Sequence, residues 1–181
     1  VESIAAHRGM ITDRHGEPVA ISTPVDSVWI HPETYLNDQK DLAQLAKLLS
    51  INPDKLKANI RKRKTREFVY IKRRVNPELS EKVMQLEIPG VSLQREYRRY
   101  YPMGEVGAHV IGFTNVDDMG QEGLELAYND WLRGSNGQQR VMKDRLGRII
   151  KHVALVKEAS PGKNLALSLD RRLQYLTYRE L

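Results

Sequence analysis

The chain has 181 residues, of which 40% are hydrophobic and 29% are charged, and its formal net charge is +6. It contains no cysteine, which excludes a disulfide framework and a thiolate metal site. No apolar run approaches the roughly 20 residues of a membrane span, and the first residues do not form a signal peptide. A chain of this length can bury a sizeable core, in one domain or in a domain with an added lobe.

The N-terminal residues predict a β-hairpin. The pattern D-R-x-G occupies residues 13–16 and is flanked by short apolar segments. Asp at the first position and Gly at the fourth suit a type I turn that a left-handed residue closes. The same pattern returns at residues 144–147, so a second, similar hairpin is expected there. The first pattern and the two residues singled out before it are Arg8, Gly9, Asp13, Arg14 and Gly16. The second pattern contains Asp144, Arg145 and Gly147.

Residues from about 30 to 90 predict an inserted lobe that is mostly helical. Asn37 or Asp38 is expected to cap a helix whose apolar residues run from Leu42 to Leu49. Asn52-Pro53 and Asn76-Pro77 predict two further helix starts, because Asn favours the N-cap and Pro the first helical position. Strands are expected at residues 67–73 and 91–97.

The run from Arg98 to Gly137 is the centre of the chain. Five apolar residues recur there at i, i+3, i+4, i+7 and i+8, which predicts one helix with one apolar face. They are Leu124, Ala127, Tyr128, Trp131 and Leu132. Gly112 is expected to end a shorter helical piece. After Gly137 the pattern becomes strand-like, and Asp170 is expected to cap a final helix from residue 171.

The central run resembles the non-catalytic N-terminal module of class B penicillin-binding proteins. The ordered pattern is R-x-Y-P, then A-H-V-I-G, G-Q-E-G-L-E and Y-x-x-x-L-x-G-x-x-G. The hairpin pattern R-G-x-I-x-D-R-x-G-x-x-(L/V)-A resembles the opening of the same family, with Val19 where Leu is more usual. The central pattern includes Arg99, Tyr101, Pro102, Gly112, Gly123, Leu124 and Glu125.

This resemblance implies an α+β fold, with a pedestal of β-strands, a packed central helix and the inserted helical lobe. It implies that residues 1–169 form the pedestal module of a division-type (FtsI-like) peptidoglycan D,D-transpeptidase, and that residues 170–181 begin its transpeptidase domain. Such an enzyme cross-links septal cell wall, is a target of β-lactams, and lies at the periplasmic face of the bacterial inner membrane. The same module of an elongation-type relative is the alternative. The expected partners are the enzyme's own transpeptidase domain, division-complex membrane proteins including a glycan polymerase, and a second copy in a homodimer.

The chain itself is expected to have no catalytic residue, metal site or cofactor. The transpeptidase motifs of this family are S-x-x-K, S-x-N and K-T-G. Ser160-Pro161-Gly162-Lys163 matches the first literally, but it lies on a Pro-Gly turn rather than at the start of a helix. Ser135-Asn136-Gly137 and Lys64-Thr65-Arg66 are weaker matches, and all three are interpreted as chance. The five histidines are not paired at metal-ligand spacing.

The positive charge is concentrated in one segment. Residues 55–74 contain ten Lys or Arg and one acid, which gives +9 and leaves −3 for the rest of a chain with a net charge of +6. Three interpretations remain open: a solvated face, a contact with a protein partner or with anionic lipid, and a nucleic-acid-binding module. No nucleic-acid-binding motif accompanies the segment, so no nucleic-acid partner is expected.

Arg8 and Glu125 are expected to form an ion pair that ties the N-terminal hairpin to the central helix. Each is a charged residue close to an apolar residue that is expected to face the core: Ile11 for Arg8, and Leu124 for Glu125. A buried Arg–carboxylate pair can be bidentate. The alternative is an exposed pair of little energetic weight, or two groups that do not meet.

Overall fold

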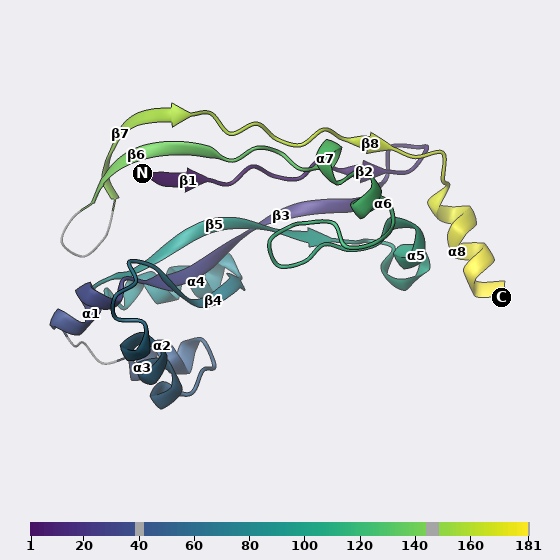
Figure 1. Cartoon of the computed structure of the whole chain (residues 1–181). Helices are drawn as coiled ribbons and strands as arrows, with labels where there is room; N and C mark the ends of the chain where they lie inside the picture. The colour runs from purple at the N-terminus through teal and green to yellow at the C-terminus, as the bar shows by residue number, and fades with distance from the viewer. Residues whose placement is uncertain (39–41, 144–148, 181) are drawn as a thin grey trace. The chain divides into compact units, whose positions relative to one another are not determined.

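The computed structural model describes residues 1–38, 42–143 and 149–180 (Figure 1). The chain divides into two compact units. Unit 1 comprises Val1–Glu2, Val25–Glu96 and Gln139–Leu155, and unit 2 comprises Ser3–Pro24, Tyr97–Gln138 and Val156–Leu181. Helices and strands alternate in no regular βαβ pattern, which makes the fold α+β, as expected.

Unit 1 combines four helices with strand segments. The helices are α1 (Pro32–Asp38), α2 (Ala43–Leu48), α3 (Pro53–Lys62) and α4 (Pro77–Gln85). The strands that lie wholly or largely in it are β4 (Val69–Val75), β6 (Gly137–Lys143) and β7 (Ile149–Lys157), together with parts of β3 (Pro18–Ile30) and β5 (Val91–Tyr100). β4 pairs antiparallel with β3, so that Trp29 lies opposite Tyr70, and β5 also pairs with β3.

The core of unit 1 is aliphatic and draws on every helix. In α3, Leu56 and Ile60 are buried one turn apart, and in α4 Val83 is buried. Burying such side chains contributes about 1.5–3 kcal/mol each. The buried residues of this core are Val28, Ile30, Tyr35, Leu42, Leu45, Ala46, Leu49, Leu56, Ile60, Val69, Val75, Val83, Ile88 and Val91.

Both Asn-Pro helix starts are confirmed. The Asn52 side chain accepts hydrogen bonds from the amides of Asp54 and Lys55, at 3.0 and 3.1 Å, and so satisfies two of the free N–H groups of α3. Asn76 also stands at the N-cap, of α4, although its side chain makes no capping hydrogen bond.

The capping role expected for Asn37 or Asp38 is wrong, because these residues lie in α1 and α2 begins after Leu42. The sequence interpretation overlooked a helix start at Pro32. There His31 Nδ1 accepts a hydrogen bond from the Thr34 amide at 3.3 Å, and Pro32 takes the first helical position. An imidazole therefore caps this helix, in place of the Asn or Asp that is usual at a helix N-cap.

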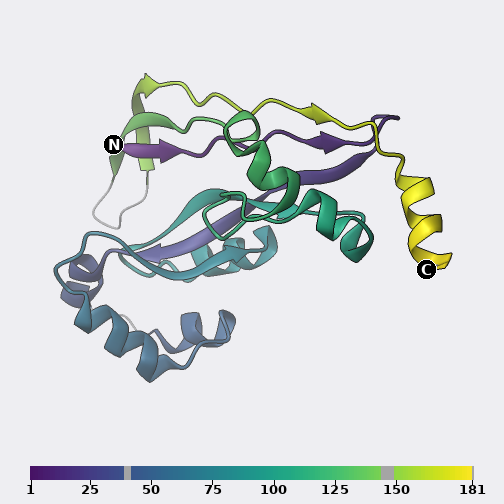
Figure 2. The same ribbon diagram turned by 45° about the vertical axis from the view of Figure 1, so that its right-hand side comes forward.

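Unit 2 contains the N-terminal hairpin. β2 (Ile11–Thr12) pairs antiparallel with β3 at Ile11–Ala20, and parallel with β8 (Leu165–Ala166) on its other side (Figure 2). The Gly16 amide donates to the Asp13 carbonyl at 3.1 Å, and Gly16 has a φ of 82°, as the expected turn requires. The first hairpin is therefore confirmed.

The second hairpin, at Asp144, Arg145 and Gly147, lies outside the described residues. The strands on either side of it, β6 and β7, are neighbours in a three-stranded sheet with the order β1-β6-β7, where β1 is Glu2–Ile4.

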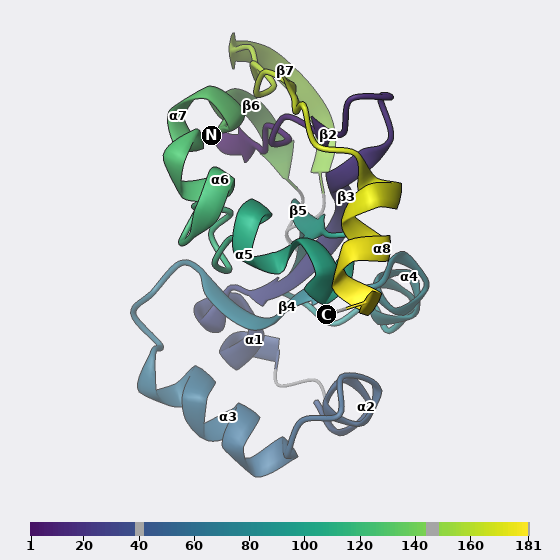
Figure 3. The same ribbon diagram turned by 90° about the vertical axis from the view of Figure 1, so that its right-hand side faces the viewer.

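The remaining elements of unit 2 are short helices and one longer C-terminal helix. They are the 3₁₀ turn η1 (Gly104–Gly107), α5 (Ala108–Ile111), α6 (Gly123–Ala127), α7 (Asn129–Leu132) and α8 (Arg171–Glu180). Asp170 caps α8, because its carboxylate accepts from the amides of Arg172 and Leu173. α8 lies beside η1 (Figure 3). The core of this unit consists of Ile11, Val19, Ala20, Met103, Ile111 and Leu132.

Candidate functional site

The most unusual feature of unit 2 is a buried cluster of two arginines and one glutamate. Glu125 has no exposed surface, and the side chains of Arg8 and Arg99 are each 1% exposed. Glu125 Oε2 lies 2.6 Å from Arg8 Nε, and Glu125 Oε1 lies 2.7 Å from Arg99 Nε. Each carboxylate oxygen thus has its own guanidinium partner, and the predicted Arg8–Glu125 pair is present.

Arg8 is held by four hydrogen bonds. Besides Nε, its Nη2 donates to the Glu125 carbonyl at 2.7 Å, and its Nη1 donates to the Asp118 carbonyl and to Asn129 Oδ1, at 3.1 and 3.0 Å. The Gly9 amide, next along the chain, donates to the Leu132 carbonyl at 2.8 Å. Arg8 therefore connects the segment before β2 to α6, to α7 and to the loop before them.

Arg99 brings a third chain segment to the same carboxylate. It lies near the end of β5, and its Nη1 donates to Ser22 Oγ in β3 at 3.1 Å. Because Glu125 is shared between the two arginines, the cluster carries two positive charges and one negative charge. A carboxylate that is buried and doubly paired is expensive to remove, since both cations would lose their partner.

The central helix differs from the expected single amphipathic helix. It is divided into α6 and α7 at Tyr128, whose φ and ψ are −109° and 25°. Tyr128 and Trp131 are exposed, and the residues that face inward are Glu125, Asn129 and Leu132. The apolar spacing did not indicate this face, because Glu125 and Asn129 are polar. Both are held there by hydrogen bonds from Arg8.

Gly112 allows the end of α5 to lie against the start of α6. It ends α5 with a φ of 76°, and a Cβ atom there would collide with the Glu122 carbonyl. Any other residue would therefore be both strained and too close. Gly123 opens α6 just beyond this contact, where a Cβ atom would lie 2.6 Å from the Val110 carbonyl. These two glycines set the position from which Glu125 reaches the arginines.

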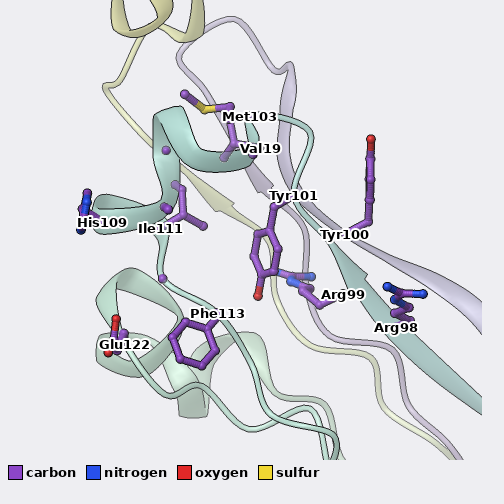
Figure 4. A pocket seen from close by; sticks show the side chains of 14 residues that line it. Val19, Arg98, Arg99, Tyr100, Tyr101, Met103, His109, Ile111, Phe113 and Glu122 are labelled. Atoms are coloured by element: carbon purple, nitrogen blue, oxygen red, sulfur yellow. The ribbon is translucent and has the colours of Figure 1, made fainter. Parts of the chain in front are cut away.

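A cavity of about 530 Å³ lies beside the cluster (Figure 4). Its floor is apolar, from Val19, Met103 and Ile111, and Tyr101 lies between this floor and Arg99. Burial raises the pKa of the Tyr101 phenol, and the negative charge of Glu125 raises it further. The polar side chains in its lining are those of Arg98, Arg99, Tyr100, Tyr101, His109 and Glu122.

The Asp13 carboxylate links the hairpin turn to the start of α8. Its Oδ1 accepts from the amides of His15 and Glu17, at 2.8 and 2.9 Å, and its Oδ2 accepts from the amide of Arg171 at 3.2 Å. Burial alone would raise the pKa of Asp13, but these three amide donors outweigh it and lower the pKa. A hydrogen bond from His15, at 3.0 Å, is the main cause of the lowered pKa of Asp170.

The other motif residues occupy supporting positions in unit 2. Arg14 is exposed, and its amide donates to the Leu169 carbonyl at 2.9 Å. Pro102 follows β5 and lines a second cavity between η1 and α8. Leu124 is partly buried against the core.

The three partial transpeptidase motifs have no catalytic geometry. Ser160 forms a β-bridge with Ser135, and both are exposed. Lys163 does not follow Ser160 along a helix, and its Nζ lies over the ring of Trp131 at 4.5 Å. Residues 64–66 lie in an exposed loop.

Sequence reasoning identified part of the cluster. It paired Arg8 with Glu125 and included Arg99 in a motif without a partner. It missed Asn129 and Ser22. A signal for Asn129 was available, because it lies one helical turn after Glu125 and so faces the same way. For Ser22 the sequence offered none.

Comparisons with known proteins place the chain in a family. Residues 3–167 match the model of the penicillin-binding protein dimerisation domain. The chain is 44% identical to the peptidoglycan D,D-transpeptidase FtsI of Escherichia coli, over 100% of this chain and 32% of that protein. It is 38% identical to the probable peptidoglycan D,D-transpeptidase PenA of Neisseria meningitidis, over 99% of this chain and 32% of the relative.

Solved structures give the same fold. The complex between penicillin-binding protein PBP2 and MreC from Helicobacter pylori superposes with a TM-score of 0.72 at 22% identity, and covers 98% of this chain and 37% of that one. A peptidoglycan synthetase from Bifidobacterium adolescentis superposes with a TM-score of 0.60 at 22% identity, over 98% of this chain and 37% of the other. The chain thus spans about one third of the length of the curated relatives described above. It belongs to the penicillin-binding protein dimerisation domain family.

Proposed function

We propose that this chain is the non-catalytic pedestal of a division-type peptidoglycan D,D-transpeptidase. In this role it holds the catalytic domain in place and offers surfaces to division partners. The observation that carries the proposal is the 44% identity to FtsI over the whole chain. The likeness to PBP2 is a likeness of fold at 22% identity, and therefore does not favour the elongation-type alternative.

The buried cluster supports a structural role for this segment. Arg8, Arg99 and Glu125 come from three parts of the sequence and satisfy one another inside unit 2. A buried polar network that joins distant segments favours one specific arrangement of the chain over others. In this proposal, that arrangement of the chain holds the catalytic domain in position.

The proposed domain plan follows from the same assignment. Residues 1–169 form the pedestal module, with an inserted lobe at about residues 30–90, and residues 170–181 begin the transpeptidase domain. α8 supports this boundary, because its side chains Leu173, Tyr175 and Leu176 are exposed as the next domain's contact surface would be. The full protein would cross-link the peptide stems of septal peptidoglycan.

The proposed location is the periplasmic face of the bacterial inner membrane. Among the described residues, no helix has the length and apolar character needed to cross a bilayer. The proposed partners are division-complex membrane proteins, including a glycan polymerase, and a second copy of the chain. The PBP2 relative was solved in complex with MreC, which supports partner binding by this fold.

A segment exchange tests the proposal. The part of E. coli FtsI that aligns with this chain is replaced by residues 1–181, and the chimera is expressed in cells whose own FtsI is inactivated. We expect the chimera to restore septation. The matched control exchanges the same segment for that of the H. pylori PBP2, which has the same fold and low identity. Filamentous cells containing a stable, membrane-located chimera would contradict the division assignment.

A further inference from the structure

A loop joins α3 to β4 (Figure 3). The last turn of α3 and this loop together carry dense, exposed positive charge. Residues 61–66 are all exposed, and five of the six are Lys or Arg. None of these five side chains forms a hydrogen bond or ion pair with another described residue. We call residues 61–66 the basic turn; its cations are Arg61, Lys62, Arg63, Lys64 and Arg66.

The cations that follow in β4 are different, because they serve the fold. Lys72 Nζ donates to the Leu49 carbonyl at 2.7 Å. Arg73 Nη2 lies 3.0 Å from Glu96 Oε1, and its guanidinium lies over the ring of Tyr70 at 4.8 Å. Within residues 55–74, the five cations of the basic turn are therefore exposed to solvent, whereas Lys72 and Arg73 interact with other parts of unit 1.

Interactions within the fold account for only two of the five cations of the basic turn. Arg61 and Lys62 lie in the last turn of α3, where positive charge is favourable toward the helix dipole. Arg63, Lys64 and Arg66 lie beyond the end of the helix. Like charges this close along the chain repel one another. A negatively charged partner would relieve that repulsion.

An exposed aromatic side chain, Phe68, lies two residues after the basic turn, beyond the exposed Glu67. Phe68 is 37% exposed, and its ring packs on Trp29 and Tyr70 with centroid distances of 4.7 and 4.6 Å. These contacts hold Phe68 in one place beside the cations. Aromatic rings next to Lys and Arg are typical of protein surfaces that lie at the headgroup level of a membrane.

We propose that the basic turn binds the anionic headgroups of a phospholipid surface, with Phe68 at the level of the headgroups. Positive charge is concentrated around this turn, because residues 55–74 carry +9 and the rest of a chain with a net charge of +6 carries −3. The inference does not depend on the proposed function, since it concerns only unit 1.

Vesicle binding of the 181-residue chain tests this inference. We expect the chain to sediment with vesicles of equimolar phosphatidylglycerol and phosphatidylcholine at low salt, and not with phosphatidylcholine alone. Each Lys or Arg near an anionic surface contributes on the order of 1 kcal/mol, which is about fivefold in partitioning. Replacing all five cations of the basic turn by Gln is therefore expected to lower the partition coefficient at least about tenfold.

A matched variant controls for net charge. It replaces five exposed cations from elsewhere in the chain by Gln, namely Arg98, Arg133, Arg140, Lys157 and Arg172. We expect this variant to keep its vesicle binding within about threefold. Thermal unfolding of both variants confirms that they are folded. An equal loss in the two variants, or no binding of the unaltered chain to the anionic vesicles, would overturn the inference. Binding of the basic turn to an acidic peptide or a nucleic acid, with none to vesicles, would also overturn it.

Discussion

Replacing Glu125 by Gln is expected to destabilise the chain more than replacing either arginine by Ala. Glu125 has no exposed surface and its two oxygens lie 2.6 and 2.7 Å from two guanidinium groups. Gln removes the negative charge and leaves two buried cations without an anion. Arg8→Ala or Arg99→Ala leaves one pair in place. Breaking a buried ion pair costs about 3–5 kcal/mol, out of about 5–15 kcal/mol for a whole domain.

Urea unfolding, followed by circular dichroism, measures these free energies. We expect Glu125→Gln to lose about 3–5 kcal/mol and each single arginine variant to lose less. The Arg8→Ala, Glu125→Gln double mutant is expected to lose at least about 1 kcal/mol less than the sum of its singles. The control is Glu105→Gln, an exposed carboxylate in η1, which should change stability by less than about 0.5 kcal/mol. Additive losses at Arg8 and Glu125 would refute the reasoning.

Three other outcomes follow from the structure. Gly112→Ala should lower the free energy of unfolding by more than about 1 kcal/mol in urea, because a Cβ atom would strain the backbone and meet the Glu122 carbonyl; an unchanged midpoint would contradict this. The pKa values of Asp13 and Asp170 are lowered by folding, so the stability they contribute is present above their usual pKa and is lost as the pH falls through their folded values. Thermal unfolding should therefore show a steep acid loss that Asp13→Asn reduces, and an equally steep loss in that variant would count against it. The isolated chain should self-associate in sedimentation, because exposed Leu and Tyr side chains on α8 favour association; a monomer at high concentration would refute this.

Local signals predicted local structure well. Asn52-Pro53 starts a helix because its capping hydrogen bonds are made within three residues, so no distant contact can easily override them. The hairpin turn at residues 13–16 is similar, since its hydrogen bond closes over four residues. The missed start of α1 has the same local nature, but it uses His31 as its cap, which propensity rules rank low.

Features that depend on contacts between residues far apart in the chain could not be predicted from local sequence patterns. The apolar spacing around Leu124–Leu132 predicted one helix with Tyr128 and Trp131 inside, yet both are exposed. The inward face is chosen by Arg8, which is more than 100 residues away along the chain and binds Glu125 and Asn129. The Arg8–Glu125 pair was predictable because both residues are charged beside inward positions. That Arg99 shares the same carboxylate depends on strand pairing that no local pattern contains.

The mass of the protein after reaction with penicillin tests most directly whether residues 1–181 contain a catalytic serine. In the proposed function the catalytic serine lies outside residues 1–181, because Ser160 lies in a β-bridge and Lys163 stacks on Trp131. We expect the isolated chain to show no penicillin adduct by intact-mass spectrometry. The E. coli FtsI chimera that carries residues 1–181 should gain one adduct, on a serine outside them. A stable adduct on the isolated chain that Ser160→Ala removes would contradict the account.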